Sequence, residues 1–483
     1  MAISPTQARI ARRAGLTALA AAPVAGALTA VRHTQDGAAP TKAPLQDERS
    51  RIAHLYRRAG FGASPAELDA AVARGYDASL DRLLSPADDH DAADDVLNQT
   101  DFDLAKLDDS QRWWLVRMRY TSRPLIEKMA LFWHGHFATA VSKVGIKQLA
   151  LMRQQNDLFR TQALGNFHDL LLSVSKDPAM LIWLDGRLNH KNVPNENYGR
   201  ELMELFTMGI GNYTEDDVKA AAHAFTGWTV NRDFQYVFNP GDHDAGSKTF
   251  LGKTGTFNGG DVVDMLAAQP ATAKFLARKL TRYFVSDPPD SGLVASLASV
   301  YLSSGYDLRA VLRALFKSDE FMTAGAYHSL IKSPAELVIG TLRTLDVTTD
   351  GTGLPGIMRT LGQELFNPPS VAGWPAGDSW IATNTVLARN NFANSIAVAQ
   401  KPESGLLANV ASLLSLPSVA TASSLADGLT TLLVDGDLSG EAQQALYAYL
   451  GAGSGEAVDL SKQDAKVRGL LYLTLATPEY NLN

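Results

Sequence analysis

Imidazole and carboxylate side chains suited to metal coordination gather at three places in this 483-residue sequence. His134 and His136 flank a single glycine, Glu201 lies in a charged segment, and His243 directly precedes Asp244. Oxygen and imidazole ligands together suit Zn, Mn, Fe or Mg-like ions. The sequence therefore predicts a divalent metal site, with these five residues as its ligands and the metal left unspecified.

The spacing of His134 and His136 restricts that prediction. Residues at i and i+2 of an α-helix point about 200° apart, so both imidazoles reach one metal only if Gly135 ends the helix. In the structural alternative, His136 completes an apolar stripe and His134 hydrogen-bonds at the helix end. The alternative for His243 and Asp244 is an ordinary turn, because Asp side chains hydrogen-bond locally in Gly- and Pro-containing loops.

The segment 195–204 carries the densest charge. Glu196, Arg200 and Glu204 follow one another at i, i+4 spacing. On an exposed helix, each such ion pair contributes only about 0.2–0.5 kcal/mol, which is the structural interpretation. On a partly buried face, Arg200 would orient the carboxylates and Glu196 or Glu204 would act as general base. We predict these three as catalytic residues of a metal-assisted hydrolase.

Further polar and aromatic residues are expected to contact substrate. Two amides flank Glu196, two adjacent cations in a predicted helix can bind an anionic substrate, and two tryptophans near residue 375 can line a groove for a sugar or peptide. Surface exposure of the cations and core packing of a tryptophan are the alternatives. The expected substrate contacts are Asn195, Asn197, Arg278, Lys279, Trp374 and Trp380.

Most of the elements that must position these residues are predicted to be helices. Asn195 is a favourable N-cap for a helix with an apolar stripe on one face. Thr214 opens the next helix, with Asp217 at capping-box spacing. The glycines between these helices, at 209 and 211, predict a turn.

One segment changes period. Aromatic residues alternate along 234–238, which predicts a strand, and 248–251 is its expected returning partner. The predicted fold is therefore mainly α, a large multi-helical globular fold with a small β-hairpin insertion near 232–251.

Composition excludes several classes of function. The formal net charge is −7 and no long basic block exists, so we expect no nucleic-acid partner. Cysteine is absent, which excludes disulfides, thiolate metal sites and a cysteine nucleophile. The sequence also lacks the nucleophile-elbow, zincin and dinucleotide-binding motifs.

The first residues predict a targeting segment. Arg9, Arg12 and Arg13 precede an apolar run over 14–30, and no acidic residue appears before Asp36. That order is typical of a signal peptide. The adjacent pair of arginines fits either a twin-arginine signal or an ordinary secretory n-region.

These features divide the chain into three parts. We expect a signal peptide over 1–30, a polar linker over 31–46 and one large, mostly helical domain over 47–483, with less distinct helices from about 401. The protein is therefore predicted to be exported to the periplasm, cell surface or medium, with no transmembrane span in the mature chain.

Six motifs in one order carry a family resemblance. They include Arg57 with Arg58, both histidines of 132–137, and the charged helix. The motifs are 54–62, 132–137, 195–202, 225–229, 243–244 and 368–375. Together they resemble the bacterial "domain of unknown function 1800" family over nearly the whole mature chain. The resemblance implies an exported bacterial protein and no defined activity. It also implies a co-encoded partner from the "domain of unknown function 1501" family.

The resemblance leaves two functions open. Phe206 stands where many relatives carry His, and His223 where many carry Arg, so neither position is predicted to be an essential ligand. The first hypothesis is a metal-assisted hydrolase acting on an envelope or extracellular substrate. The second is a non-catalytic periplasmic or surface interaction protein that works with the co-encoded partner.

Overall fold

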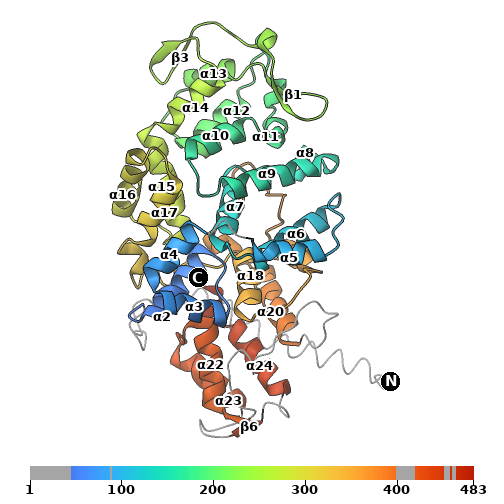
Figure 1. The fold of residues 1–483 in the computed structure, drawn as a ribbon, viewed down its shortest axis with the longest axis vertical. Helices are drawn as coiled ribbons and strands as arrows, with labels where there is room; N and C mark the ends of the chain where they lie inside the picture. The colour runs from blue at the N-terminus through green and yellow to red at the C-terminus, as the bar shows by residue number, and fades with distance from the viewer. Residues whose placement is uncertain (1–44, 87–89, 399–418, 451–456, 460–463) are drawn as a thin grey trace.

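The chain folds into an elongated stack of helices (Figure 1). In this computed structural model, the described residues are 45–86, 90–398, 419–450, 457–459 and 464–483. The predicted signal peptide and all but the last two residues of the predicted linker lie outside them. The mainly α fold class is confirmed, because helices form nearly all of the regular structure in the described ranges.

The first half of the chain rises from the middle of the molecule to its upper end, where the strands gather (Figure 1). Its central helices are α2 (Glu48–Ala59), α3 (Pro65–Arg74), α4 (Tyr76–Leu84), α5 (Ala92–Gln99), α6 (Leu107–Tyr120), α7 (Pro124–His136), α8 (Val141–Val144), η1 (Ile146–Gln148) and α9 (Leu149–Thr161). The upper elements are α10 (Phe167–Ser175), α11 (Pro178–Trp183), η2 (Gly186–Leu188), α12 (Asn197–Glu201), the π-helix η3 (Leu202–Thr207), α13 (Glu215–Ala224), β1 (Trp228–Val230), β2 (Tyr236–Phe238), η4 (Pro240–Asp242), β3 (Lys248–Phe250), β4 (Lys253–Gly255) and α14 (Gly259–Ala267).

The second half descends along the other side to the bottom of the molecule, and the chain then returns to end near its middle, where the C-terminus is marked (Figure 1). The descending helices are α15 (Pro270–Phe284), α16 (Ser291–Ser303), α17 (Leu308–Phe316), η5 (Glu320–Met322), α18 (Pro334–Thr344), α19 (Leu354–Thr360), η6 (Gly377–Trp380) and α20 (Thr383–Val398). The lowest elements are β5 (Val419–Thr421), α22 (Ala422–Val434), α23 (Gly440–Leu450), β6 (Ala457–Asp459), α24 (Asp464–Leu475) and η8 (Glu479–Asn481).

The predicted helix starts around the charged segment are present. Asn195 Oδ1 accepts from the backbone N–H of Asn197 at 2.9 Å, at the first turn of α12. Thr214 and Asp217 form both bonds of the capping box at the start of α13. The predicted capping box thus fixes the start of α13, whereas the N-cap of α12 is Glu196, one residue after the predicted Asn195 and without a side-chain cap bond.

The β region differs from the predicted single hairpin. β2 pairs with β1, which precedes it, and β3 pairs with β4. Pro240 begins a 3-10 turn directly after β2, which directs the chain away from a return along that strand. Leu251 and Gly252 both have positive φ, the geometry of a tight two-residue hairpin turn, so β3 closes locally on β4.

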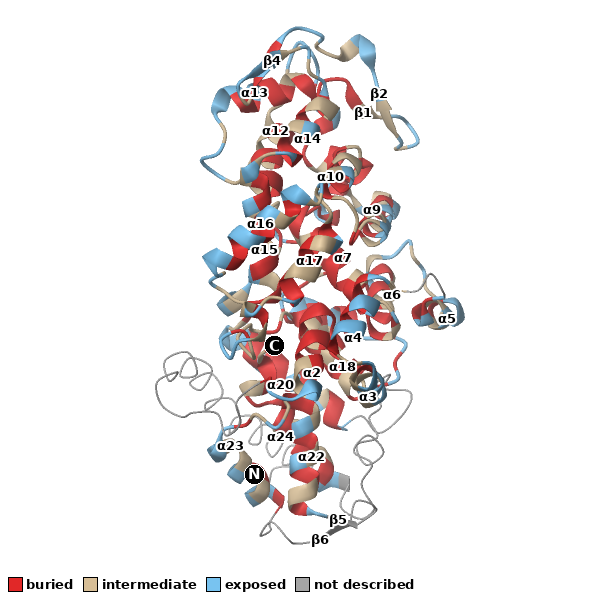
Figure 2. Ribbon diagram, turned by 60° about the vertical axis from the view of Figure 1, so that its left-hand side comes forward, coloured by how far each residue is buried: buried red, intermediate tan, exposed pale blue. Residues whose placement is uncertain are grey.

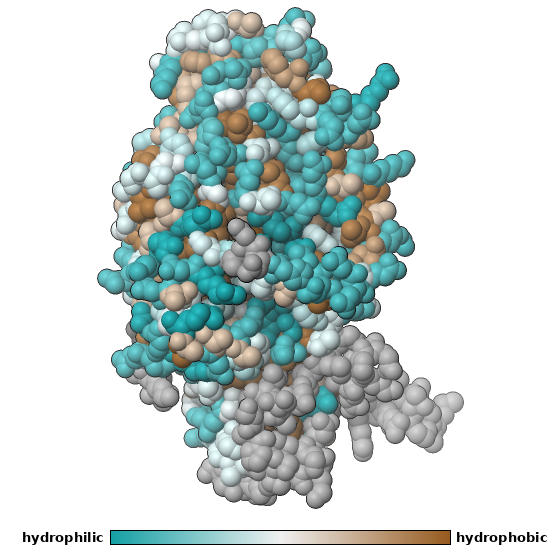
Figure 3. Space-filling model, in the orientation of Figure 1, coloured by the Kyte–Doolittle hydropathy of each residue, from teal (hydrophilic) through white to brown (hydrophobic). Residues whose placement is uncertain are grey.

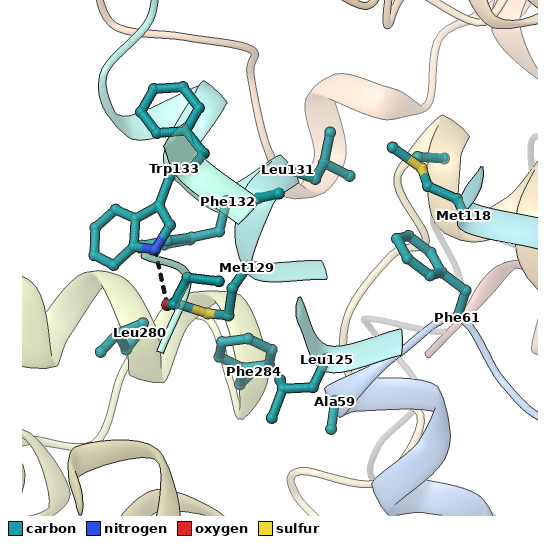
Figure 4. Close-up of a cluster of buried hydrophobic side chains, with 14 of the residues drawn as sticks. Ala59, Phe61, Met118, Leu125, Met129, Leu131, Phe132, Trp133, Leu280 and Phe284 are labelled. Atoms are coloured by element: carbon teal, nitrogen blue, oxygen red, sulfur yellow. Dashed lines mark hydrogen bonds between the residues drawn. The ribbon is translucent and has the colours of Figure 1, made fainter. Parts of the chain in front are cut away.

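Helix α7 lies at the centre of the core. Figure 2 shows it as almost entirely buried, and its apolar side chains meet those of α2, α6 and α15. In Figure 4, Met129 and Leu125 of α7 lie near Phe284, and the Trp133 indole donates to the Ala163 carbonyl at 3.1 Å. Helix α7 therefore provides a common packing surface for α2, α6 and α15.

The outer surface is largely polar. Figure 3 shows hydrophilic side chains over most of one face, with apolar residues in small separate patches. Of the helices in the described part of the chain, none is both long and apolar enough to cross a membrane.

The end of α7 is held by a close backbone contact. A Cβ built on Gly373, which has a φ of +85°, would lie 2.2 Å from the Gly135 carbonyl oxygen. The loop before η6 can therefore lie against α7 only if this position carries glycine. The same contact brings Trp374 over the end of α7, 3.8 Å from a Cβ built on Gly135.

We expect Gly373→Ala to be much more destabilising than Gly353→Ala. Gly353 has a similar φ of +82°, but a Cβ there meets nothing within 4 Å. Its substitution should cost roughly 1–2 kcal/mol for the left-handed backbone. Gly373→Ala should add roughly 1–3 kcal/mol from the contact with Gly135. Urea unfolding of both variants checks this, and equal losses would contradict the packing argument.

Candidate functional site

The charged face of α12 forms a surface ion-pair network. Arg200 donates to both carboxylate oxygens of Glu215 at 2.8 Å and to Glu196 at 3.1 Å. Glu204, the expected second partner, instead accepts from the Tyr213 hydroxyl at 2.9 Å. The Arg200 side chain is one-third exposed, and exposed pairs of this kind contribute about 0–1 kcal/mol. The network connects α12 to α13.

Glu201 is half-buried at the junction of α12 and η3. Burial and the neighbouring Glu204 raise its pKa, because both disfavour the charged carboxylate. The charged groups that act on Glu201 are therefore those of its own helix. Neither α7 histidine is among them.

His134 occupies an aromatic cage. The centre of its ring lies 5.2 Å from Trp374, 5.6 Å from Trp114 and 5.8 Å from Phe366. Burial alone lowers its pKa to about 3, so the imidazole is neutral at physiological pH. Among the residues that the structure describes, none forms a hydrogen bond with its Nε2.

His136 and Lys279 meet at the end of η3. His136 Nε2 donates to the Phe206 carbonyl at 3.0 Å, and Lys279 Nζ donates to His136 Nδ1 at 3.1 Å and to the Leu205 carbonyl at 3.3 Å. The last carbonyls of a helix lack donors within the helix, so these side chains supply them. Burial, with a contribution from Arg282, lowers the pKa of Lys279 to about 8.

His243 and Asp244 fasten the loop after η4 to the end of α13. Asp244 Oδ2 accepts from His223 Nδ1 at 2.6 Å, and the Asp244 backbone N–H donates to Thr226 Oγ1 at 2.8 Å. His243 Nδ1 donates to the Thr226 carbonyl at 2.9 Å, and Lys248 Nζ reaches the Asp244 carbonyl at 2.5 Å. His223 was not predicted to be an essential ligand, and its side chain hydrogen-bonds to the Asp244 carboxylate.

The expected ligands do not form one coordination sphere. His134 and His136 face different surroundings, and His243 and Asp244 are engaged at the loop after η4. Across the described ranges, no group of three or more His, Cys, Asp or Glu side chains is arranged to hold a metal ion. The divalent metal therefore stays a prediction, without a ligand set in that part of the chain.

The other expected substrate contacts are dispersed. Asn195 and Asn197 hydrogen-bond within their own turn, and Asn197 Nδ2 also donates to the Leu184 carbonyl at 3.3 Å. Trp380 is buried, and Trp374 belongs to the cage of His134. Arg278 is exposed on α15, beside Lys274 in a hollow of about 430 Å³.

A larger cavity lies elsewhere, in the lower half of the molecule. It encloses about 830 Å³ between α2, α18, α22 and η8, and we call it the α2–α22 cavity. Figure 1 shows α2, α18 and α22 together in this region. The wall residues that the argument uses are Arg57, Phe61, Tyr327, Lys332, Glu336 and Asp435.

Five buried cationic side chains lie at the inner end of this cavity: Arg57 and Lys332 line its wall, and the other three lie behind the wall, where Lys128 contacts Glu336 and Arg389 contacts Lys332. All are 12% exposed or less, and we call them the cation cluster. They are Arg57, Arg58, Lys128, Lys332 and Arg389. Two carboxylates lie among them: Lys128 Nζ is 2.5 Å from Glu336, and Arg57 Nη2 is 2.6 Å from Asp435. The cation cluster thus contains more cations than partner carboxylates, although the cavity wall as a whole carries five carboxylates (Asp47, Glu336, Asp427, Asp435 and Asp437) and three cations (Arg49, Arg57 and Lys332).

Of the two members of the cation cluster that line the cavity, Arg57 is paired with Asp435, whereas Lys332 forms no ion pair with a carboxylate among the described residues. Its Nζ donates to the Tyr480 carbonyl at 2.7 Å and lies 3.9 Å from the centre of the Tyr480 ring. Burial, followed by the charge of Arg57, lowers its pKa to about 7. A large fraction of this amine is therefore neutral at physiological pH.

Several buried donors near the cavity lack acceptors. Within the described part of the chain, Arg57 Nε in the cavity wall has no hydrogen-bond partner, and neither do Arg58 Nε and Nη1 and Arg389 Nε behind the wall. A buried polar group without a partner costs about 1–3 kcal/mol, and a charged one more. An anion bound at this end of the cavity would offset part of that cost.

Sequence reasoning missed this site, although one signal was available. Arg57 and Arg58 were noted as part of the first family motif and were not assigned a role. Adjacent residues of a helix point about 100° apart. Arg57 and Arg58 therefore cannot both lie on the solvent-facing side of α2, opposite its apolar residues. Lys332 and Glu336 gave no comparable signal, because Ser333 and Glu336 read as an ordinary capping box.

Comparison with known proteins gives one match. A family model described as "Protein of unknown function (DUF1800)" covers residues 54–482, nearly the whole chain. No curated protein and no solved structure matches the chain.

We expect His134→Leu to reduce acid destabilisation. The folded protein holds His134 neutral, whereas the unfolded chain binds a proton below about pH 6.5, so stability is lost as pH falls from there toward 3. Urea unfolding at pH 7 and pH 5 should show a smaller loss for the variant than for the wild type.

His168→Leu is the matched control. Burial lowers the pKa of His168, but hydrogen bonds to Asp169 and Asp264 outweigh it and raise the pKa overall. Its stabilisation is present at low pH and lost as pH rises, so this variant should show a larger loss on acidification. Identical pH dependence in both variants and the wild type would contradict the assignment.

Proposed function

Because the chain belongs to the DUF1800 family and that description assigns no activity, we propose a function from its own side chains: the protein binds a small organic anion in the α2–α22 cavity. One observation carries this proposal, namely that Arg57 and Lys332 lie in the wall of a cavity of about 830 Å³. Small-molecule sites usually have volumes of about 300–1,000 Å³.

Charge supports an anionic ligand. The two carboxylates of the inner end are already engaged: Glu336 accepts from Lys128 and from Asn483 Nδ2, and Asp435 accepts from Arg57. In its protonated form, the Lys332 amine has no ion-pair partner among the described residues. Because charges held out of water are costly unless paired, the inner end of the cavity favours an incoming carboxylate or similar oxyanion.

The remaining wall supports a ligand with an apolar body. Phe61, Leu68 and Leu433 line the cavity beside the polar groups. The rest of the wall carries charges of both signs, from Asp47, Arg49, Asp427 and Asp437, and carboxylates predominate there. The ligand class that fits is therefore an amphipathic acid, with its head toward Arg57 and Lys332.

The cavity bears differently on the two functions predicted from the sequence. No observation in the described residues favours the metal-assisted hydrolase over other activities. The non-catalytic protein with a co-encoded partner from the "domain of unknown function 1501" family is compatible with a ligand-binding cavity. Both stay predictions, and the cavity supports anion binding in preference to either.

Export is part of the proposal and rests on the order of Arg9, Arg12, Arg13 and the apolar run 14–30. We expect the mature protein outside the cytoplasm and shortened by about 30 residues, measured by cell fractionation and intact mass. The double variant R12K/R13K should block a twin-arginine route and spare an ordinary secretory one. Retention of residues 1–30 in cytoplasmic protein would contradict export by either route.

We expect the anionic fluorophore 8-anilinonaphthalene-1-sulfonate to bind the α2–α22 cavity saturably. The double variant R57Q/D435N removes the guanidinium without leaving Asp435 unpaired. It should weaken binding about tenfold or more, because hydrogen bonds to charged groups contribute roughly 1.5–3 kcal/mol. Fluorescence titration measures the affinity.

The matched control is K143Q/D185N, which removes an exposed ion pair with a 2.9 Å contact near α8. It should leave the affinity unchanged. Equal affinity in the wild type and R57Q/D435N would show that the probe binds elsewhere and would overturn the proposal.

A further inference from the structure

Lys332 is placed as a nucleophile would be. Its side chain is only 6% exposed, yet it forms part of the wall of the α2–α22 cavity. The amine is held by the Tyr480 carbonyl and faces the Tyr480 ring, so neither contact is an ion pair that would hold the amine protonated. Its backbone is fixed as well, because Arg389 donates to the Lys332 carbonyl at 2.7 Å.

Two other buried lysines lack this combination. Lys128 is fully buried but lies 2.5 Å from the Glu336 carboxylate, which favours its protonated form. Lys279 has no carboxylate partner, but its amine is engaged by His136 and the Leu205 carbonyl at the end of η3, away from the cavity wall. Among these three, Lys332 alone joins an unpaired amine to a cavity large enough for a ligand.

We propose that Lys332 binds the ligand covalently: its Nζ forms an imine with the carbonyl carbon of an oxo acid whose carboxylate lies beside the Arg57 guanidinium. This rests on the proposed function, because the oxo acid is the organic anion that the cavity takes. Arg57 has an Nε donor without an acceptor, which the carboxylate would supply.

The chemistry needs no additional reactant. The lone pair of the neutral amine attacks the carbonyl carbon, and the carbonyl π electrons move to oxygen. A proton passes from nitrogen to that oxygen to give a carbinolamine. Loss of the hydroxyl with a second proton from nitrogen forms the C=N bond and one water molecule. The net reaction is amine plus carbonyl compound to imine plus water.

The charged groups around Lys332 favour the neutral amine. Arg57 of α2 and Arg389 of α20 disfavour its protonation, and Glu336 of α18 and Asp435 after α22 favour it. Burial is the largest effect and acts with the arginines, giving a pKa of about 7. The rate of imine formation should therefore rise with pH through about 7 and then level off.

The experiment traps the imine in the full-length protein. The probe is 2-oxooctanoate with sodium borohydride, and octanoate is the same anion without the carbonyl. Intact mass should show one adduct per chain with 2-oxooctanoate and none with octanoate, and peptide mapping should place it at Lys332. Excess octanoate should suppress the adduct by occupying the cavity.

Substitutions at Lys332 and at a control lysine separate this inference from the proposed function. Lys332→Met and Lys332→Arg should both lose the adduct, whereas Lys143→Gln, at an exposed lysine outside the cavity, should keep both the adduct at Lys332 and the octanoate affinity of the wild type. Octanoate binding without trapping at Lys332 would overturn the imine and leave anion binding intact. Trapping at exposed lysines only would also overturn it. If neither acid binds, the proposed function fails and the imine with it.

Discussion

The lower half of the molecule depends on buried ion pairs between cationic side chains and carboxylates. Glu336 caps α18, accepts from Lys128 of α7 and meets Asn483, so one carboxylate connects three segments. Asp435 similarly joins α22 to Arg57 of α2. Removing one partner of a buried ion pair typically costs about 3–5 kcal/mol, because the other charge is left unpaired. The cavity therefore lies in a part of the fold where removing one charged side chain is expected to lower the stability of the protein strongly.

In the upper half, the groups that need partners are the backbone carbonyls at the end of a helix. The π-helix η3 ends with carbonyl groups that no following turn can satisfy, and His136 and Lys279 donate to two of them from other helices. The side chains that looked most like ligands thus have structural partners. The charged face of α12 similarly connects α12 to α13 through Arg200 and Glu215.

Local chemistry was predictable from the sequence, and tertiary burial was not. The helix start at Thr214 follows from its capping box, α12 begins within two residues of the predicted cap Asn195, and the mainly α class follows from apolar periodicity. The pairing of β2 with β1 depended on where Pro240 and Leu251 turn the chain, which alternation alone does not reveal. The sequence around Lys332 did not indicate its role. The low pKa of its amine results from burial and from the nearby charges of Arg57 and Arg389, which only the packing of α2, α20 and η8 brings together.

The central claim is that the inner end of the α2–α22 cavity binds an organic anion between Arg57 and Lys332. Crystals grown with 4-bromobenzoate test it most directly, because anomalous scattering locates the bromine and ordinary density locates the carboxylate. The account predicts a bromine peak inside the cavity, with the carboxylate within hydrogen-bond distance of the Arg57 guanidinium and the Lys332 amine. A cavity that holds only water, with bromine peaks confined to the outer surface, would contradict it.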